Sequence, residues 1–144
     1  MRHGEALGQA ATDADRALTE FGARQVRDVA GHLLGKSLTS IQTSPYLRAQ
    51  QSAEIVATLV DYRGPYQSQD WLRPQTDPVK VTDEIDWLAV GNHLLIGHQP
   101  LLGRLLGLLV DGELRHPYPL ATAGLAELEG ELPVPGGMRL VAVY

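Results

Sequence analysis

Apolar residues recur every three or four positions in four stretches of the chain, and shorter apolar runs lie between these stretches. In residues 19–34, for example, Val26, Ala30 and Leu33 fall on one face of a helix, and Gly35 follows as a C-terminal stop. The predicted helices cover residues 19–34, 44–60, 81–90 and 100–111. The predicted strands cover residues 37–44, 93–98, 123–129 and 138–144. The turn-rich stretch between residues 61 and 80 has room for one short strand.

Helices and single strands alternate along most of the sequence. A strand, a helix and a following strand usually form a crossover unit whose strands are parallel. The pattern therefore predicts an α/β fold, a three-layer sandwich with a mostly parallel central sheet and helices on both faces. The last two strands, joined by "LPVPGG", are expected to pair with each other. No repeat or change of composition divides the chain, so we expect a single domain over residues 1–144.

Composition and charge exclude several classes of partner. The chain carries a formal net charge of −5, so no general attraction to nucleic acid or to an anionic membrane is expected. It has no cysteine, which excludes disulfides, thiolate metal sites and thiol catalysis. No apolar run reaches membrane-spanning length, and the expectation is a soluble cytoplasmic protein. Any anion site must therefore be a local cluster of positive charge.

Two junctions between a strand and a helix carry candidate functional residues. In open α/β sheets, ligands bind at the carboxyl ends of the strands. Arg48 follows the strand at 37–44, in the opening turns of a helix, where positive charge is unfavourable unless an anion also binds there. His98 lies at the end of the strand at 93–98, in the tight segment "GHQP" that follows "HLLI". Taken alone, Arg48 could equally be a solvated surface arginine, and His98 a capping histidine.

Three short motifs, "RHG", "SPYLRAQQSAE" and "GHQP", occur in this order along the chain. Together they closely resemble the histidine phosphatase superfamily, which contains phosphoglycerate mutases and acid phosphatases. The resemblance implies an α/β sandwich that works through a phosphohistidine intermediate without a metal ion. Matched position by position, His3 corresponds to the nucleophile, Arg2 and Arg48 to the phosphate-binding arginines, and His98 to the second histidine beside the phosphate. The short length and the ending "LATAGLAELE" are most similar to the SixA-type phosphohistidine phosphatases.

The physical chemistry of these residues fits the roles that the resemblance implies. An imidazole attacks phosphorus only when the reacting nitrogen is unprotonated, and two nearby arginines disfavour its cationic form. The same arginines can bind the phosphoryl oxygens and stabilise the charge of the transferring group. Because arginine supplies this charge, no metal or other cofactor is required. The spacing of the histidines matches no metal-binding motif either.

The motifs quoted above do not include a general acid, so the candidate must come from another segment. Mutase-type members of the superfamily use a carboxylate that follows the central helix. In this chain the corresponding segment, "SQDWLRPQTDP", offers Asp70 and Asp77. Asp77 is the candidate acid, although a loop carboxylate among prolines suits a solvated turn equally well. A phosphohistidine substrate has imidazole as its leaving group, which needs no strong acid.

The resulting hypothesis is a phosphatase that acts on phosphohistidine in a protein. The alternatives are a phosphatase of small phosphate esters from the same superfamily, or a degenerate phosphate-binding module without catalysis. A mutase fits poorly, because the chain lacks room for the usual covering insertions. The loops around residues 61–80 and 112–120, which would choose the substrate, carry no recognisable code.

The superfamily resemblance also carries an expectation about the start of the chain. It implies that "RHG" follows a central apolar β-strand, whereas only Met1 precedes this motif here. The first strand is therefore expected to be truncated, and the missing segment is expected to be about five residues, which is most of a typical strand. A poorly anchored terminus would then carry His3.

Overall fold

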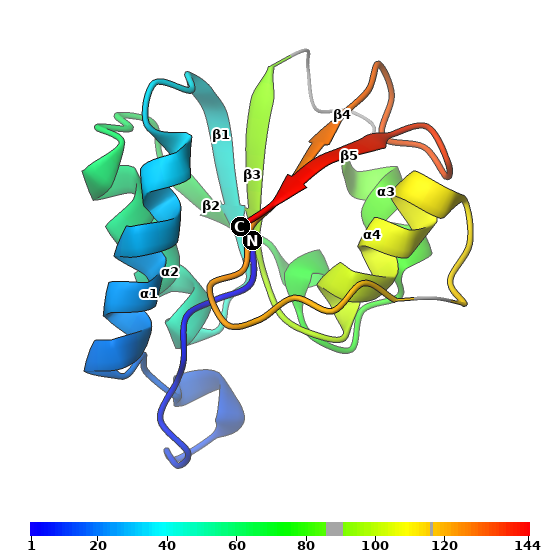
Figure 1. Cartoon of the computed structure of the whole chain (residues 1–144). Coiled ribbons are helices and arrows are strands. Elements are labelled where there is room, and N and C mark those ends of the chain that lie inside the picture. Colours follow the sequence, from blue (N-terminus) through cyan, green and yellow to red (C-terminus); the bar gives the residue numbers. More distant parts are fainter. Residues whose placement is uncertain (86–90, 116) are drawn as a thin grey trace.

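Three parallel strands form the central sheet of the molecule. They are β1 (Leu38–Thr43), β2 (Tyr66–Ser68) and β3 (Asn92–Ile96), in the order β2-β1-β3 (Figure 1). β4 (Ala126–Glu129) and β5 (Arg139–Val143) form a separate antiparallel pair, as the sequence predicts. The computed structural model describes residues 1–85, 91–115 and 117–144.

Helices cover both faces of the parallel sheet. The α-helices of the described residues are α1 (Glu20–Ala30), α2 (Leu47–Leu59), α3 (Pro78–Ile85) and α4 (Leu101–Asp111). Three short 3-10 helices, η1 (Asp13–Asp15), η2 (Gly31–Leu33) and η3 (Asp70–Leu72), complete the elements of the described chain. Figure 1 shows α1 and α2 on one side of the sheet and α3 and α4 on the other. The predicted α/β class, with helices on both faces of a mostly parallel sheet, is confirmed. No helix in the described part of the chain is both long and apolar enough to cross a membrane.

Two of the three apolar clusters among the described residues connect the helices to each other and to the sheet. The first joins α1 and α2 to the sheet through Val26, Val56, Ile41 and Ile96, all of them fully buried. The second joins α3 to α4 and includes Val81, Leu101 and Leu105. Burying a side chain of this size contributes about 1.5–3 kcal/mol, so the clusters fix the position of β1 and β3. The carboxyl ends of these two strands are therefore rigid supports for the residues that follow them.

The start of α2 differs from the prediction. The sequence suggests Ser44 as the N-terminal cap, but Tyr46 occupies that position and the helix begins at Leu47. Tyr46 has an extended backbone (φ −71°, ψ 136°), which prevents the helix from starting earlier. The helix predicted at 81–90 begins at Pro78, and residues 86–90 lie outside the described part of the chain.

Residues 1–3 lie between the end of β3 and the segment that leads into β4. The backbone N–H of Gly97 donates to the Met1 carbonyl (3.1 Å), and the N–H of His3 donates to the Gly97 carbonyl (3.1 Å). On the other side, the N–H of Arg2 donates to the Gly124 carbonyl (2.8 Å). This parallel bridge fixes the backbone of Arg2 and His3 beside the carboxyl end of β3 (Figure 1).

An apolar groove of about 880 Å³ lies between β3 and β4, beyond Met1. Leu94, Leu105, Leu125 and Leu128 are among the side chains that line it. β3 is the edge of the three-stranded sheet, so its backbone faces this groove. The α-amino group of Met1 donates to the Leu95 carbonyl (2.7 Å), and burial lowers the pKa of this amino group to about 5. The groove thus has the apolar lining and the exposed strand edge that an additional β-strand requires.

We predict that an apolar extension of about five residues, such as Val-Val-Ile-Val-Val, fused before Met1 will raise the melting temperature. Its backbone can pair with β3, and each apolar side chain that enters the groove adds about 1.5–3 kcal/mol of stability. Thermal unfolding followed by circular dichroism measures the effect. The control is a Gly-Ser extension of equal length, which also replaces the buried amino group with an amide. Equal melting temperatures for the two extensions would contradict the prediction.

Candidate active site

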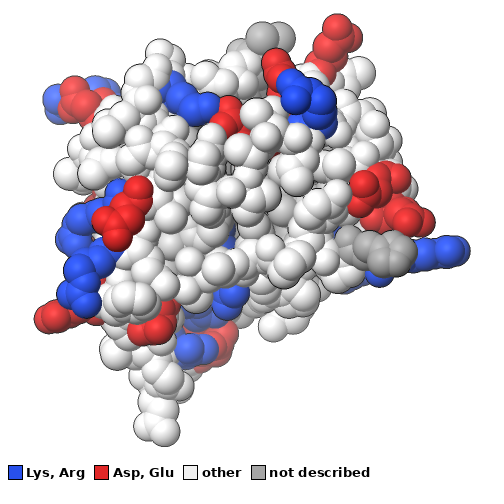
Figure 2. All heavy atoms as spheres, viewed as in Figure 1, with Lys and Arg blue, Asp and Glu red and all other residues white. Residues whose placement is uncertain are grey.

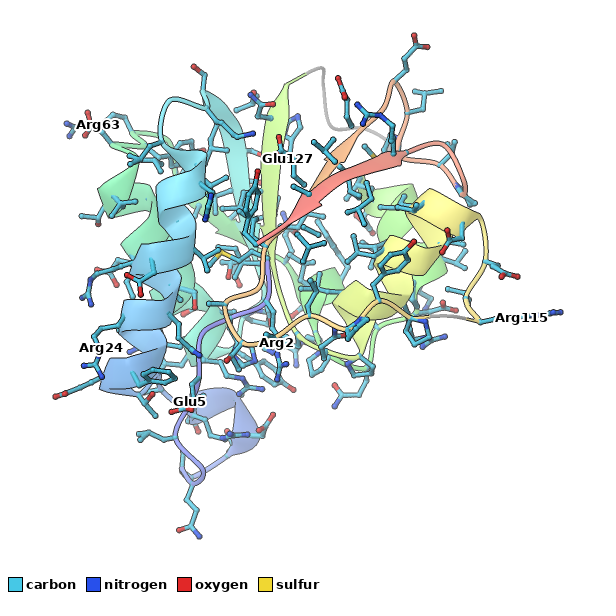
Figure 3. All side chains as sticks on the ribbon, in the orientation of Figure 1. Arg2, Glu5, Arg24, Arg63, Arg115 and Glu127 are labelled. Atoms are coloured by element: carbon cyan, nitrogen blue, oxygen red, sulfur yellow. The ribbon has the colours of Figure 1, made fainter. Side chains whose placement is uncertain are left out.

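Four side chains predicted from the sequence meet at the carboxyl ends of the parallel strands. Arg2 and His3 come from the N-terminal bridge, Arg48 from the first turn of α2, and His98 from the segment between β3 and α4. The ring centroids of His3 and His98 are 4.9 Å apart, and Arg48 Nε lies 3.1 Å from His3 Nε2. Figure 3 shows Arg2 below the ends of β1 and β3. Segments far apart in the sequence thus form one cluster.

Hydrogen bonds fix the tautomer of His3. Its Nδ1 lies 2.6 Å from the Gly4 carbonyl, which can only accept, so Nδ1 carries the hydrogen. Arg48 Nε–H donates to His3 Nε2, which must therefore present a lone pair. Burial lowers the pKa of His3 to about 4; the Gly4 bond opposes this shift, and the nearby Arg48 and Arg2 reinforce it. At neutral pH, His3 is therefore an uncharged imidazole with a lone pair on Nε2.

His98 is the most deeply buried member of the cluster, with 1% of its surface exposed. Its Nε2 lies 2.7 Å from Ser44 Oγ, and its ring meets the Tyr46 ring edge-on at 4.9 Å between centroids. Burial, followed by the adjacent His3 and Arg48, lowers the pKa of His98 to about 3. His98 is therefore neutral as well, so the positive charge of the cluster comes from its arginines.

The two arginines of the cluster differ in how their donors are used. Arg48 is buried, and its Nη1 and Nη2 donate to the backbone carbonyl (2.6 Å) and to Oδ2 (3.1 Å) of Asp13. Arg2 donates from Nη1 to the Leu120 carbonyl (2.8 Å). Burial lowers the pKa of Arg2, and repulsion from the nearby Arg48 adds to this effect. An anion bound beside the two guanidinium groups would relieve that repulsion.

Two buried polar atoms in this cluster lack a hydrogen-bond partner. They are Arg2 Nε and His98 Nδ1. Among the residues that the structure describes, no other buried side-chain nitrogen or oxygen atom lacks a hydrogen-bond partner. Leaving a buried polar group unpaired costs about 1–3 kcal/mol, so such groups usually mark a place where a ligand or water binds. Both atoms belong to the site that the sequence motifs define.

The rest of the surface offers no competing field of positive charge on the face seen in Figure 2. Basic and acidic side chains lie mainly at its margins, often next to each other, and much of the centre is uncharged. With a formal net charge of −5, attraction of an anion must come from the local pair of guanidinium groups.

The glycine of the "RHG" motif is required by packing. A Cβ atom on Gly4 would lie 2.4 Å from the Gly22 carbonyl oxygen of α1, a distance that real contacts do not reach. The N–H of Gly4 donates to Ser52 Oγ (3.2 Å), and Ser52 Oγ donates to the Arg48 carbonyl (2.7 Å). This close approach joins the N-terminal segment to α1 and α2, so His3 and Arg48 are held in register.

Sequence reasoning missed three residues of this site. Asp13 binds Arg48, Ser44 binds His98 instead of capping α2, and Ser52 joins Gly4 to α2. Ser44 and Ser52 fall within the "SPYLRAQQSAE" motif, so the motif gave a signal for them. Asp13 lies in a polar loop of no recognisable pattern, and only the fold brings it to Arg48.

Asp77, the candidate general acid, has contacts away from this cluster. Its side chain is exposed, and its Oδ1 accepts from the N–H of Val79 (3.1 Å) at the start of α3. The neighbouring Asp70 pairs with Arg73 (2.7 Å). Among the described residues, no hydrogen bond or ion pair joins either carboxylate to His3 or His98. The role of Asp77 as general acid stays a prediction.

The fold and the site define a class that comparison with known proteins supports. Residues 1–73 match the sequence profile of the histidine phosphatase superfamily (branch 1). The chain is 32% identical over 133 residues to the phosphohistidine phosphatase SixA of Escherichia coli (strain K12). The alignment covers 89% of this chain and 81% of that protein. This chain therefore belongs to the histidine phosphatase superfamily, and it is a phosphatase that needs no metal ion.

Two further comparisons point to the same branch. A phosphohistidine phosphatase SixA homolog of Haemophilus influenzae is 30% identical over 140 residues, covering 89% of this chain and 84% of that protein. The solved structure of the protein histidine phosphatase SixA complexed with tungstate superposes with a TM-score of 0.90 at 30% identity. The match covers 99% of this chain and 92% of the other. SixA-type proteins are thus similar to this chain over almost its entire length.

We predict that the buried histidines make the folded chain less stable below pH 6.5. Above that pH both are neutral in the folded and unfolded chain. As the pH falls, the unfolded chain takes up protons at pKa 6.5, whereas folded His3 and His98 resist protonation until their pKa values of about 4 and 3. Each histidine therefore lowers the free energy of unfolding by about 1.4 kcal/mol per pH unit in this window.

Urea unfolding between pH 6.5 and 5 measures this slope. The variant His98→Asn should lose about half of the histidine contribution, whereas Ser52→Ala should lower stability at every pH and keep the slope. The Met1 amino group, whose pKa falls from 8.0 to about 5, adds the same slope to all variants and cancels in the comparison. A His98→Asn slope equal to that of the wild type would contradict the prediction.

Proposed function

We propose that this phosphatase hydrolyses phosphohistidine in a protein through a covalent phosphohistidine intermediate on His3. The observation that supports this most directly is the lone pair on His3 Nε2, which accepts from Arg48 in a cluster that also holds two buried nitrogen atoms without a partner, Arg2 Nε and His98 Nδ1. A bound phosphoryl group would place its phosphorus atom beside the nucleophile and its oxygen atoms beside the polar groups that lack partners.

In the first step of this mechanism, the His3 Nε2 lone pair attacks phosphorus and the bond between phosphorus and the substrate nitrogen breaks. The electron pair of that bond goes to the leaving ring, which departs as neutral imidazole when the other ring nitrogen of the substrate already carries a proton. Arg48 Nε–H, which donates to Nε2 in the free protein, is then free to donate to a phosphoryl oxygen beside Nε2 without a change of its direction. The Gly4 carbonyl, which accepts from Nδ1, stabilises the positive charge that develops on the His3 ring.

Ser44 sets the part that His98 plays. The Ser44 hydroxyl can donate to His98 Nε2, which leaves the hydrogen of neutral His98 on Nδ1. Nδ1 is the atom without a partner, so its N–H is free to donate to a phosphoryl oxygen. Arg2 Nε–H can do the same. These donors stabilise the charge on the transferring group in a site from which water is largely excluded.

In the second step, water attacks phosphorus and the bond to His3 Nε2 breaks. The electron pair returns to Nε2, a proton of the water is released, and inorganic phosphate leaves. The arrangement favours a phosphohistidine substrate over an alkyl ester, because an alkoxide leaving group needs a strong acid. Asp77, the predicted acid, is exposed and accepts a hydrogen bond from the N–H of Val79 at the start of α3.

A substrate screen tests this proposal. We predict that the wild type hydrolyses a phosphohistidine peptide with a kcat/KM at least about tenfold above that for sugar phosphates and a phosphoserine peptide. His3→Ala should lose about 10³-fold or more with every substrate, because the nucleophile is gone. Asp77→Asn is the matched control and should keep the activity on phosphohistidine.

Other outcomes of the screen would select another function. Faster hydrolysis of a sugar phosphate, together with loss of activity in Asp77→Asn, would favour a phosphatase of small esters. Binding of inorganic phosphate without turnover of any substrate would favour a phosphate-binding module. Either result would contradict the proposal.

A further inference from the structure

η1 places an acidic residue directly on the arginine of the candidate site. Arg48 Nη1 donates to the backbone carbonyl of Asp13 at 2.6 Å, and Nη2 donates to the carboxylate at 3.1 Å. The Arg48 side chain is 6% exposed, whereas that of Asp13 is 54% exposed. A buried guanidinium is thus neutralised by a carboxylate at the surface of the site.

These contacts determine where the third donor of Arg48 points. A guanidinium is planar, and its five N–H groups have fixed directions. Once Nη1 and Nη2 are held by Asp13, the Nε–H direction is fixed as well. It points at His3 Nε2, 3.1 Å away. The face of Tyr46, 4.9 Å from Arg48 Cζ, restricts rotation of the guanidinium out of this plane.

Asp13 is itself held from the side opposite Arg48. Arg16 Nη1 donates to Asp13 Oδ1 (2.9 Å), and Arg16 Nε donates to the Leu7 carbonyl. The N–H of Leu7 donates to the Ala17 carbonyl (2.9 Å), which closes the loop that carries η1. The bond from Arg16, and next the contacts with Arg48, keep the pKa of Asp13 below its usual value, so its carboxylate stays ionised.

We propose that Asp13 is a positioning residue of this phosphatase: it fixes the guanidinium of Arg48 so that Nε–H faces the position where the phosphoryl group joins His3. The proposal rests on the function proposed above for His3 and Arg48. Asp13 touches neither reacting atom and acts through Arg48. Its negative charge also opposes the binding of a phosphate dianion nearby, so turnover and phosphate affinity should respond differently to its removal.

The variant Asp13→Asn removes this charge with little change of shape. We expect kcat for p-nitrophenyl phosphate to fall about tenfold or more, because small misplacements of a catalytic group can cost up to about 10²-fold. The inhibition constant for inorganic phosphate should stay within about twofold of the wild type or fall. A loss of folding alone would also leave the inhibition constant unchanged, but it would lower the fraction of active protein. Active sites are therefore counted by burst titration, kcat is expressed per active site, and the melting temperature is measured.

Asp15→Asn is the matched control. Asp15 lies in the same 3-10 turn, and its Oδ2 accepts from Thr12 Oγ1 (2.7 Å), away from Arg48. Its kcat should equal that of the wild type. If Asp13→Asn unfolds at the assay temperature, Arg16→Gln provides a second test, because it removes the bond that holds the Asp13 carboxylate against Arg48 and leaves both Asp13 and Arg48 unchanged in sequence. We expect it to lower kcat in the same direction.

The outcomes separate this inference from the proposed function. A kcat per active site of Asp13→Asn within twofold of the wild type overturns the inference, and so does a rise of the phosphate inhibition constant that matches the fall in kcat. An unchanged kcat with tighter phosphate binding would show that Asp13 only competes with the substrate. A wild type that hydrolyses no substrate would overturn the proposed function first, and the inference with it.

Discussion

The hydrogen bond from Arg48 Nε to His3 Nε2 joins two parts of the chain that are 45 residues apart. It exists only because α2 starts at the carboxyl end of β1 and residues 1–3 lie beside the carboxyl end of β3. The glycine contact between Gly4 and Gly22 and the bonds of Ser52 hold the two segments together. The apolar clusters on both faces of the sheet fix the strands and α2, and they therefore set the geometry of this bond.

Burial and charge act together at this bond. Burial makes both histidines of the site neutral, and the arginines reinforce that state. The result is a nucleophile with a lone pair beside fixed positive charge, which is the combination that phosphoryl transfer requires. The free protein bears the cost in the form of repulsion between Arg2 and Arg48 and of two unpaired buried atoms. A phosphoryl dianion would relieve both, so substrate binding is stabilised by interactions that the empty site lacks.

Much of the site could be predicted from the sequence because its residues lie in short motifs tied to strand ends. Hydrophobic spacing indicates β1 and β3, and the residues that follow them, Arg48 and His98, then belong to one edge of the sheet. The α/β class follows from the same alternation of strands and helices.

Other features could not be predicted, because they depend on contacts between distant segments. Ser44 looks like a helix cap, but the extended backbone of Tyr46 releases its hydroxyl to His98. Asp13 lies in a loop whose sequence has no periodicity, and its role follows only from the position of Arg48. The hydrogen bond that Asp77 accepts from the first turn of α3 likewise follows only from the fold.

The central claim is that His3 carries the phosphoryl group during turnover. Rapid mixing with a radiolabelled phosphohistidine peptide, followed by denaturation in alkali and peptide mapping, tests it most directly. The account predicts a label that is stable to alkali, labile to acid and located on His3, and that is absent in His3→Ala. Turnover by the wild type at full rate without any label on His3, or with label on another residue, would contradict it.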